Sequence, residues 1–427
     1  MIRFIYNLLW PIGLLVFLPG YLVKMFRRGG YRENFGQRLG MFHVDLRKKL
    51  ASTSPLWLHA VSVGEVAIAL KLAPEIRALM PDWPCVLTTT TTTGFAFAKA
   101  NAPAWIQVIY APLDFWPIMR HAFTVIRPRQ IVLIEAEVWP NLVAEANRRR
   151  IPLALVNARL SPRSEGRFRR FRFFVSPMFR MLDLICVQNV EDIERWTALG
   201  VGPEHLRHVG SIKYDPENVH VDLAIPREVL RAAKIDNHRP VLLGGSTHHG
   251  EEEILAKIFC EIRTQFPDLF LILAPRHVER AAEVERVLAQ FGLRVHRRSA
   301  PLIDLDHLDC LLLDSTGELR HWYSAATIVF IGKTLLARGG QNPAEAIMAG
   351  KPVLFGSHME NFSAFARELI EHGGALQVSS AAELQNAIVD LLRDGTGRDA
   401  LVRNAREVLE QHHGAAARTA KLIVDLA

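Results

Sequence analysis

The chain has 427 residues, enough for two or three domains of ordinary size, each with its own core. Hydrophobic residues make up 49% and charged residues 22%, so the composition excludes a disordered or fibrous protein. The 51 lysines and arginines exceed the 44 aspartates and glutamates, and the net charge of +7 favours anionic partners such as phosphorylated substrates, nucleic acid or a membrane surface. The four cysteines lie far apart, which excludes a zinc ribbon or a disulfide scaffold and indicates a reducing compartment.

The N-terminus predicts a membrane anchor. Residues Phe4–Val23 carry no charge, and as a helix they would extend roughly 30 Å, about one hydrocarbon thickness. Pro11 and Pro19 would kink that helix, so a shallow or re-entrant anchor is an alternative, and a buried core helix is another. Basic residues follow the apolar run and place the rest of the chain on the cytoplasmic side. We therefore expect residues 1–30 to attach the protein to a membrane.

Short apolar runs alternate with amphipathic helical stretches along the rest of the chain, as is typical of parallel sheets covered by helices. A first series of strands is expected at Leu56–Ala60, Cys85–Thr89, Ile131–Ile134, Leu153–Asn157 and Leu184–Gln188. A second series is expected at Val241–Gly244, Leu269–Ala274, Cys310–Leu313, Ile328–Ile331 and Pro352–Phe355. The fold class is therefore α/β.

A polar segment with several prolines separates the two series and predicts a boundary between two similar halves. The expected organisation is an anchor at 1–30, a first Rossmann-like domain at 31–213, a linker at 214–239, a second Rossmann-like domain at 240–405 and a C-terminal helix at 406–427. That last helix is expected to pack back on the first domain.

Acidic residues follow two predicted strands of the first half. Ser62 and Glu65 have the S-x-x-E spacing of a capping box at the start of a helix. The alternative is catalytic, because open α/β sheets bind ligands at the carboxyl ends of their strands and a glutamate there can act as a general base. Glu135 and Glu137 follow another strand, with the same two interpretations: facing a ligand or capping the next helix.

Three strand-to-helix corners in the second half predict a nucleotide site. They are Gly244–Glu251, the capping-box pattern Asp314–Glu318, and Arg338–Glu345 with its glycine pair, asparagine cap and proline. Small residues let a ligand approach the backbone, and helix N-termini attract phosphate. Neither the P-loop nor the dinucleotide spacing of glycines is present. Arg276 and His277 close another strand and would add a cation and a titratable ring at the same edge.

The stretch Arg159–Arg180 predicts a membrane-contacting surface. It carries seven arginines, interleaved with five phenylalanines that a merely solvated face would not need. A basic, aromatic surface that dips into anionic lipid is favoured over nucleic-acid stacking. The arginines expected at this surface are Arg163, Arg167, Arg169, Arg170 and Arg172.

Seven motifs occur in order along the chain: His59–Glu65, Glu135–Asn141, Asn157–Ser161, Gly210–Asp215, Ser246–His248, Pro275–His277 and Gly339–Glu345. Together they resemble the 3-deoxy-D-manno-octulosonate (Kdo) transferases of Gram-negative bacteria, from the anchor to the last third of the chain. The resemblance implies a GT-B glycosyltransferase, in which two Rossmann-like domains face each other across a cleft. It implies transfer of Kdo from CMP-Kdo, bound by the C-terminal domain, to lipid IVA, bound by the N-terminal domain, in lipopolysaccharide core biosynthesis. The enzyme would lie on the cytoplasmic side of the inner membrane.

The resemblance also implies roles for individual residues. Glu65 would be the general base of an inverting single displacement, while Glu137 or Glu135, together with Lys213, would stabilise the transition state. The residues implied to bind the donor are Ser246, Thr247, His248, Arg276, His277, Thr316, Gly317, Glu318, Gly339, Gly340, Asn342, Pro343, Ala344 and Glu345.

No metal or other cofactor is expected, because the D-x-D sequence at Asp304–Asp306 has no supporting ligands. The expected partners are CMP-Kdo, lipid IVA and the anionic lipids of the inner membrane, but no nucleic acid. Two other functions stay open: a GT-B enzyme that uses a UDP-sugar, and a non-catalytic nucleotide-binding scaffold at the membrane surface. The number of Kdo residues transferred also stays open, because it depends on the shape of the site.

Overall fold

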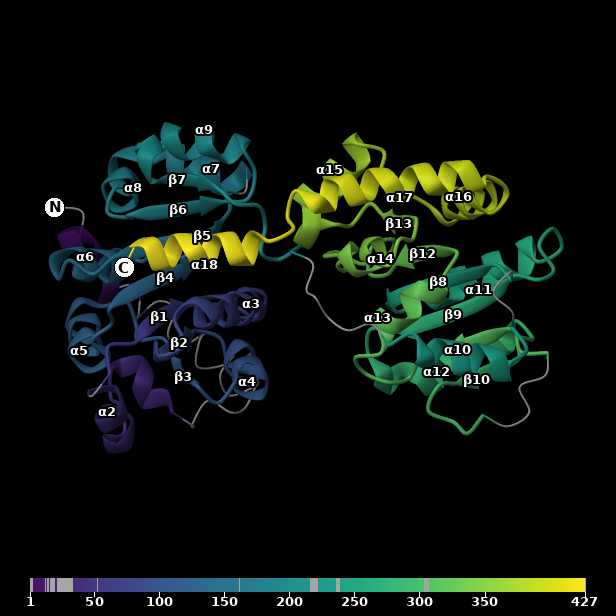
Figure 1. The fold of residues 1–427 in the computed structure, drawn as a ribbon, viewed down its shortest axis with the longest axis horizontal. Helices are drawn as coiled ribbons and strands as arrows, with labels where there is room; N and C mark the ends of the chain where they lie inside the picture. The colour runs from purple at the N-terminus through teal and green to yellow at the C-terminus, as the bar shows by residue number, and fades with distance from the viewer. Residues whose placement is uncertain are drawn as a thin grey trace. The chain divides into compact units, whose positions relative to one another are not determined.

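The computed structural model describes residues 3–11, 13, 15, 20, 34–51, 53–160, 162–215, 222–235, 239–302 and 307–426. The chain divides into two compact units (Figure 1): unit 1 is Met1–Asp215 with His412–Ala427, and unit 2 is Pro216–Gln411. Within the described residues, each unit contains one seven-stranded sheet whose neighbouring strands all run parallel. Two parallel α/β units confirm the predicted fold class.

The sheet of unit 1 has the strand order β3-β2-β1-β4-β5-β6-β7. Its strands are β1 (Leu56–His59), β2 (Cys85–Thr89), β3 (Ile106–Tyr110), β4 (Gln130–Ile134), β5 (Leu153–Ala158), β6 (Leu184–Val187) and β7 (Leu206–His208). The chain builds β2 and β3 on one side of β1 and then crosses to place β4 on the other side. The strand order therefore reverses between β1 and β4.

Helices cover both faces of this sheet. They are η1 (Phe35–Leu39), α2 (Val44–Ala51), α3 (Val63–Leu79), α4 (Thr92–Asn101), α5 (Trp116–Ile126), α6 (Pro140–Arg148), α7 (Pro162–Arg170), α8 (Arg172–Phe179), α9 (Glu191–Ala198), η2 (Pro203–His205) and α18 (Ala415–Leu426). On one face, Trp57 of β1 packs in a core cluster with Phe123 of α5. On the other face, Leu58 lies in a cluster with Leu72 of α3 and Ile423 of α18. Burial of both faces explains why the central strands are mostly apolar.

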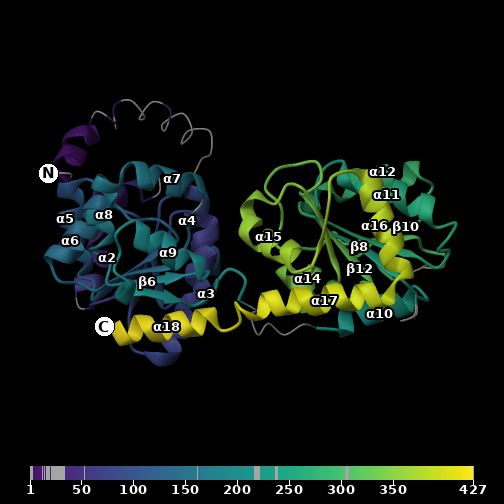
Figure 2. The ribbon, with the colours of Figure 1, turned by 90° about the horizontal axis from the view of Figure 1, so that it is seen from above.

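The C-terminal helix α18 is part of unit 1. It lies along α3 (Figure 2). The buried Gln130 side chain of β4 donates a hydrogen bond to the Ile423 carbonyl at 2.9 Å. The Asp215 carboxylate accepts from the backbone N–H groups of Gly414 and Ala416, at 2.8 and 2.7 Å, and so caps the start of α18.

The sheet of unit 2 has the order β10-β11-β9-β8-β12-β13-β14, which reverses between β8 and β12. Its strands are β8 (Val241–Thr247), β9 (Phe270–Pro275), β10 (Val295–Arg297), β11 (Cys310–Leu312), β12 (Ile328–Ile331), β13 (Val353–Gly356) and β14 (Leu376–Val378). Its helices are α10 (Ala224–Ala232), α11 (Glu251–Ile262), η3 (Val278–Arg280), α12 (Ala281–Gln290), α13 (Leu319–Trp322), η4 (Tyr323–Ala325), α14 (Ala344–Met348), η5 (Glu360–Phe362), α15 (Ser363–Glu371), α16 (Ala381–Arg393) and α17 (Gly395–Glu410).

All ten strands predicted from sequence are present, whereas β3, β7, β10 and β14 were not predicted. Strand β8 also extends to Thr247, three residues beyond its predicted end. A Cβ atom on Gly244 would lie 2.7 Å from Leu255 of α11 and 2.9 Å from Leu273 of β9, so this glycine permits close packing inside the sheet layer. Helix α10 lies within the expected linker and belongs to unit 2.

The described part of the predicted anchor is short. Residues 3–11 are helical and contact the rest of unit 1, whereas positions 12, 14, 16–19 and 21–33 lie outside the described residues. Among the residues that the structure describes, no helix combines the length and the hydropathy needed to cross a membrane.

Candidate active site

The polar residues singled out in each unit follow the carboxyl ends of strands, and several of them follow the two strands that flank the reversal of strand order. In unit 1 these are β1, which is followed by Glu65, and β4, which is followed by Glu135 and Glu137. In unit 2 they are β8, which ends in Ser246 and Thr247, and β12. Open parallel sheets bind their ligands at this position, because the loops from the two strands diverge there and leave room between them.

Glu65 lies in the first turn of α3 and completes the predicted capping box. The Ser62 side chain accepts from the Glu65 backbone N–H, and the Ser62 hydroxyl donates to Glu65 Oε1 at 2.7 Å. The Val61 N–H donates to Glu65 Oε2, also at 2.7 Å. The capping interpretation is therefore confirmed. It does not exclude catalysis, because a carboxylate has about four lone-pair sites, and these two donors occupy only some of them.

The pKa of Glu65 distinguishes it from an ordinary cap. Burial raises the pKa of this carboxyl to about 7; the hydrogen bonds from Val61 and Ser62 lower it, while the nearby Glu137 and Glu135 raise it further. Glu383 at the start of α16 has a similar arrangement, with Ser379 N–H and Oγ donating to its two oxygens at 2.8 and 2.7 Å. There the hydrogen bonds from Ser379 lower the pKa.

The comparison separates capping from burial. Capping by itself stabilises the carboxylate, whereas at Glu65 burial and two neighbouring acids outweigh it. A carboxyl that titrates near neutral pH is in the range where general-base catalysis is most effective.

Glu135 and Glu137 lie in the loop that follows β4. Glu135 has a φ of +62°, an uncommon left-handed conformation for a residue other than glycine and one found often at functional sites. Burial raises the pKa of Glu135, and the cations Lys213 and Arg159 lower it. Glu137 accepts a hydrogen bond from the Trp139 indole at 2.9 Å. The structure thus brings both acids within electrostatic reach of Glu65.

Lys213 is held close to these acids by the loop after β7. Burial lowers the pKa of Lys213, Glu135 raises it and Arg159 lowers it. The loop is fixed by the buried Asn157, whose Oδ1 accepts from the Ile212 N–H at 3.0 Å and the Ser211 hydroxyl at 3.3 Å. Unit 1 therefore brings the buried Glu65 together with half-buried carboxyls and cations at the carboxyl ends of its strands.

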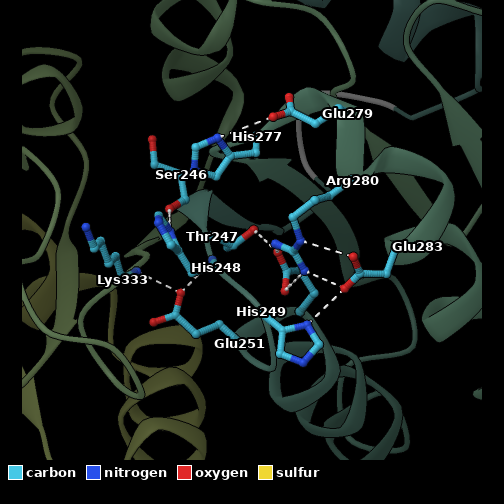
Figure 3. Close-up of polar contacts among 11 residues, drawn as sticks. Ser246, Thr247, His248, His249, Glu251, His277, Glu279, Arg280, Glu283 and Lys333 are labelled. Carbon is cyan, nitrogen blue, oxygen red and sulfur yellow. Dashed lines mark hydrogen bonds and ion pairs between the residues drawn. The ribbon is translucent and has the colours of Figure 1, made fainter. Parts of the chain in front are cut away.

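The start of the candidate donor site in unit 2 is the turn from β8 to α11. Ser246 has a φ of +55°. The Arg276 N–H donates to the Thr247 carbonyl at 3.0 Å, so the residues after β9 lie beside those at the end of β8. The rings of His248 and His277 meet edge to face at 5.7 Å between centroids, as Figure 3 shows.

The buried Glu251 ties this turn to the loop after β12. Its carboxylate accepts four backbone hydrogen bonds: from His248 at 2.9 Å, Lys333 at 2.7 Å, Thr334 at 3.0 Å and Leu335 at 3.1 Å. Only 1% of Glu251 is exposed. Glu251 is therefore the structural link between the two strands at the reversal point (Figure 3).

Side chains of both charges surround this turn. Burial lowers the pKa of His248, and Lys333 and His277 lower it further, although Glu251 acts in the opposite sense. The buried Glu252 is already paired with Arg280 at 2.9 Å. The first turn of α11 carries three glutamates, so the chain's own carboxylates complement this helix N-terminus. Contacts to an incoming phosphate therefore fall to the cationic side chains rather than to the start of α11.

The loop after β12 contains the glycine pair. Gly339 and Gly340 have φ values of +120° and +74°, and the Gly340 N–H donates to the Lys333 carbonyl at 3.0 Å. Asn342 Oδ1 accepts from the Ala344 N–H at 3.1 Å, but the N-cap residue of α14 is Pro343 rather than the predicted Asn342, and it offers no side-chain cap. Pro343 and Glu345 lie at the start of the same short helix.

One predicted capping box is wrong. Glu318 precedes α13, but the start of that helix has no side-chain cap. The Glu318 carboxylate instead pairs with Arg298 at 3.1 Å, and Gly317 before it has a φ of +87°. Thr316 and Gly317 are exposed in the loop after β11, at the same carboxyl end of the sheet as Arg276, which follows β9.

No group of three or more His, Cys, Asp or Glu side chains within the described residues is arranged to hold a metal ion. Asp304 and Asp306 of the D-x-D sequence lie outside the described residues.

Comparison with known proteins assigns the chain to a family. A family model for 3-deoxy-D-manno-octulosonic-acid transferase (kdotransferase) matches residues 33–216. The chain is 34% identical over 398 residues to the 3-deoxy-D-manno-octulosonic acid transferase of Haemophilus influenzae, covering 92% of this chain and 91% of that protein. It is 33% identical over 413 residues to the protein of the same name from Bordetella pertussis, covering 93% of both. This chain belongs to the Kdo transferase family.

The resemblance seen in the sequence is thereby confirmed, and the chain is a glycosyltransferase. The same fold occurs in the UDP-GlcNAc 2-epimerase of Neisseria meningitidis, with a TM-score of 0.55 and 13% identity over 87% of this chain and 98% of that one. At this identity only the GT-B-like fold is shared. The fold alone therefore does not identify which nucleotide sugar the enzyme uses.

Sequence reasoning had not assigned roles in this Kdo transferase to Asn157, Arg159, Glu251 and Lys333. Asn157 and Lys333 follow the same rule as the predicted residues, because each is a polar residue at or just after the carboxyl end of a buried strand. Both also have positive φ values, +51° and +58°. That position, rather than any motif, is the signal that could have identified them.

Helices α7 and α8 form the basic, aromatic surface of unit 1. Arg167, Arg169, Arg170 and Arg172 are exposed, as are Phe171, Phe173 and Phe174. Phe179 instead packs against Trp196 in the core, 5.1 Å between ring centroids, so not every phenylalanine of the stretch belongs to the surface. The side chain of Arg163 lies outside the described residues.

Proposed function

We propose that this enzyme transfers Kdo from CMP-Kdo to lipid IVA by an inverting single displacement, with Glu65 as the general base. The observation that carries the proposal is the environment of Glu65: a buried carboxyl at the carboxyl end of β1 whose pKa is raised to about 7. Membership of the Kdo transferase family supports the choice of donor sugar, and the motif residues of both units support the assignment of sites.

In this reaction the acceptor oxygen forms a bond to the anomeric carbon of Kdo. The bond from that carbon to the CMP phosphate oxygen breaks, and its electron pair leaves with CMP. Glu65 takes the proton of the acceptor hydroxyl as the oxygen attacks. Lys213 and Arg159 oppose the effect of burial on Glu135 and favour its ionised form. Together these charges can stabilise a positive anomeric centre and hold the anionic sugar.

In unit 2, the departing phosphate gains charge as CMP leaves. Arg276 and Lys333 supply cations at the strand ends where that phosphate would bind, and the His277 ring lies next to Arg276. His248 lies among them and contributes a ring N–H donor when it is in the appropriate tautomer. Fixed cations of this kind replace the role that a divalent metal plays for many diphosphate donors.

The proposed function is tested with the purified full-length enzyme, lipid IVA and freshly generated CMP-Kdo, with the products resolved by mass. We expect mass increases of one or more Kdo residues, and the pattern also gives the number transferred. Calorimetry with CMP and UDP should show binding of CMP alone. Binding of UDP but not CMP, or no Kdo addition by protein that binds CMP, would contradict the proposal.

Arg276→Ala is expected to raise the apparent KM for CMP-Kdo about tenfold, the typical effect of losing a hydrogen bond to a charged group. It should also lower kcat if the guanidinium assists the departure of CMP. Arg286→Ala on α12 is the control, because the side chain of Arg286 is exposed and donates a hydrogen bond to Ala282 of its own helix. An unchanged donor KM for Arg276→Ala would remove this residue from the donor site.

Turnover is expected to be complete in EDTA, since the proposed donor contacts are cationic side chains. The measurement is the initial rate before and after chelation. Loss of activity that magnesium restores would overturn the proposal of a metal-independent reaction.

We further propose that the N-terminal segment and the surface of α7 and α8 bind the cytoplasmic face of the inner membrane together. Removing residues 1–28 should leave a folded protein. Changing Arg167, Arg169, Arg170 and Arg172 to glutamate in the truncated protein should then weaken binding to anionic vesicles, and the difference should shrink as salt is raised. Sedimentation with vesicles of anionic and neutral lipid measures both effects. Unchanged binding after both changes would refute a shared membrane surface.

A further inference from the structure

The N-terminal helix, residues 3–11, is amphipathic in the reverse of the usual sense. Its apolar side chains face outward, with Phe4 72%, Leu8 62% and Leu9 55% exposed. Its polar side chains, Arg3 and Asn7, make hydrogen bonds to Asn141 in the body of unit 1. A plain hydrophobic anchor has no need of these polar contacts, and polar residues in apolar segments are costly unless they have a partner and a role.

The polar contacts converge on the first turn of α6. Arg3 Nε donates to Asn141 Oδ1 at 3.0 Å. The side-chain amides of Asn7 and Asn141 form two reciprocal hydrogen bonds, at 2.9 and 3.0 Å. Asn7 Oδ1 also accepts from the Trp116 N–H at 3.1 Å, which ties the helix to the start of α5. Trp10 stacks on Phe115 at 4.8 Å beside this contact.

Asp114 completes the cluster. The N-cap residue of α6, Trp139, offers no side-chain cap. The buried Asp114 carboxylate takes that role by accepting from the N–H groups of Asn141 and Leu142, at 3.0 and 2.8 Å. The side chain of Tyr6, from the N-terminal helix, is hydrogen-bonded to the same carboxylate.

The cluster leads directly to the acids of the candidate active site. The loop that carries Glu135 and Glu137 enters α6 through Trp139. The Trp139 indole donates to Glu137 at 2.9 Å, and its ring meets His59 of β1 edge to face at 4.5 Å. A shift at the start of α6 would therefore move Trp139, and with it the acids that face Glu65.

We propose that Arg3 and Asn7 are positioning residues, through which the N-terminal helix holds the loop of Glu135 and Glu137 in place while its apolar face remains free to contact lipid. This inference rests on the proposed function for the role of those acids. It means that the N-terminal helix acts on the reaction itself, in addition to attaching the enzyme to the membrane.

The test compares two substitutions on opposite faces of this helix in the full-length enzyme, assayed in detergent micelles. Asn7→Leu removes the amide pair with Asn141 and keeps the segment apolar. Leu8→Asn is the matched control, because it makes a comparable change on the outward face. We expect Asn7→Leu to lower kcat by about ten- to a hundredfold, the effect of a small misplacement of reacting groups, with anionic-vesicle binding unchanged. Leu8→Asn should weaken vesicle binding and leave kcat unchanged.

Two further measurements separate positioning from a general loss of fold. Amide hydrogen exchange at Asn141 and Leu142 should become faster in Asn7→Leu, because the cluster that holds their acceptor is loosened. The acid limb of the kcat/KM profile should move to lower pH, because Glu135 and Glu137 raise the pKa of Glu65 and would move away from it in the variant. Lys213 and Arg159, the cations that act on Glu135, are not changed by the substitution. A simple loss of active enzyme would lower the rate without moving the limb.

The inference would be overturned if the Asn7→Leu variant had the same amide exchange, the same kcat and the same pH profile as the wild-type enzyme. If the wild-type enzyme adds no Kdo to lipid IVA while exchange at Asn141 and Leu142 still rises in the variant, the proposed function fails and the positioning contact stands. Faster exchange together with an unmoved acid limb and a normal kcat would show that the contact is structural only, which also overturns the inference.

Discussion

Glu65→Gln is expected to lower kcat by about 10²–10⁴-fold, the usual contribution of a general base. Glutamine preserves the capping geometry, since its carbonyl can accept from the Val61 N–H and its amide can donate to the Ser62 hydroxyl. The variant lacks only the basic carboxylate. CMP binding should be unchanged, because the residues proposed to bind CMP belong to unit 2. Steady-state kinetics with lipid IVA, together with CMP calorimetry, measure the two effects.

Glu383→Gln is the control for this prediction. Glu383 receives the same kinds of hydrogen bond at the start of α16, but it is exposed and its pKa is lowered rather than raised. If capping were the only role of such a glutamate, both variants would behave alike. A Glu65→Gln enzyme that retains more than about a tenth of the normal rate would remove Glu65 as the base, and Glu135 and Glu137 would become the next candidates.

The raised pKa of Glu65 also predicts a pH dependence. The base is ionised only above its pKa, so kcat/KM of the wild-type enzyme should fall as the pH drops through about 7. For stability the sign is opposite. A carboxyl whose folded-state pKa lies above the ordinary value of 4.5 stabilises the fold below that value, and this contribution is lost as the pH rises through about 7. Glu65→Gln should therefore be at least as stable as the wild type at pH 8, as chemical unfolding will measure.

Glu251→Gln is expected to destabilise unit 2 and to weaken CMP binding. Each oxygen of Glu251 accepts two backbone N–H groups, so an amide NH₂ in place of one oxygen leaves two buried donors without an acceptor. The cost is about 1–3 kcal/mol of unfolding free energy for each donor. The loop of Lys333 and the turn of His248 would also lose their common fixed point.

Chemical denaturation and CMP calorimetry measure these effects on stability and on binding. Glu253→Gln serves as the control: it lies in the same first turn of α11 but is exposed. Stability and CMP affinity equal to those of the control would show that the loops are held by other contacts.

The sequence by itself determined the α/β class, the ten central strands and the order of the site motifs. Central strands are buried on both faces, so they read as unbroken apolar runs, and every residue of β1 and β4 is in fact buried. The missed strands β3, β7, β10 and β14 are the four edges of the two sheets. One side of an edge strand meets solvent, so β7 and β14 each contain exposed residues and show no apolar run.

Only the tertiary structure decided which polar residues share an environment. Local spacing predicts that Glu65 caps a helix, but its raised pKa depends on burial and on Glu135 and Glu137. These two acids are far from Glu65 in the sequence and come close to it because β4 pairs with β1. The role of Glu251 likewise depends on the pairing of β8 with β12, which brings the Lys333 loop to its carboxylate. A one-dimensional pattern records the hydrophobicity that buries a strand, whereas electrostatic coupling depends on strand order, which is set by long-range packing.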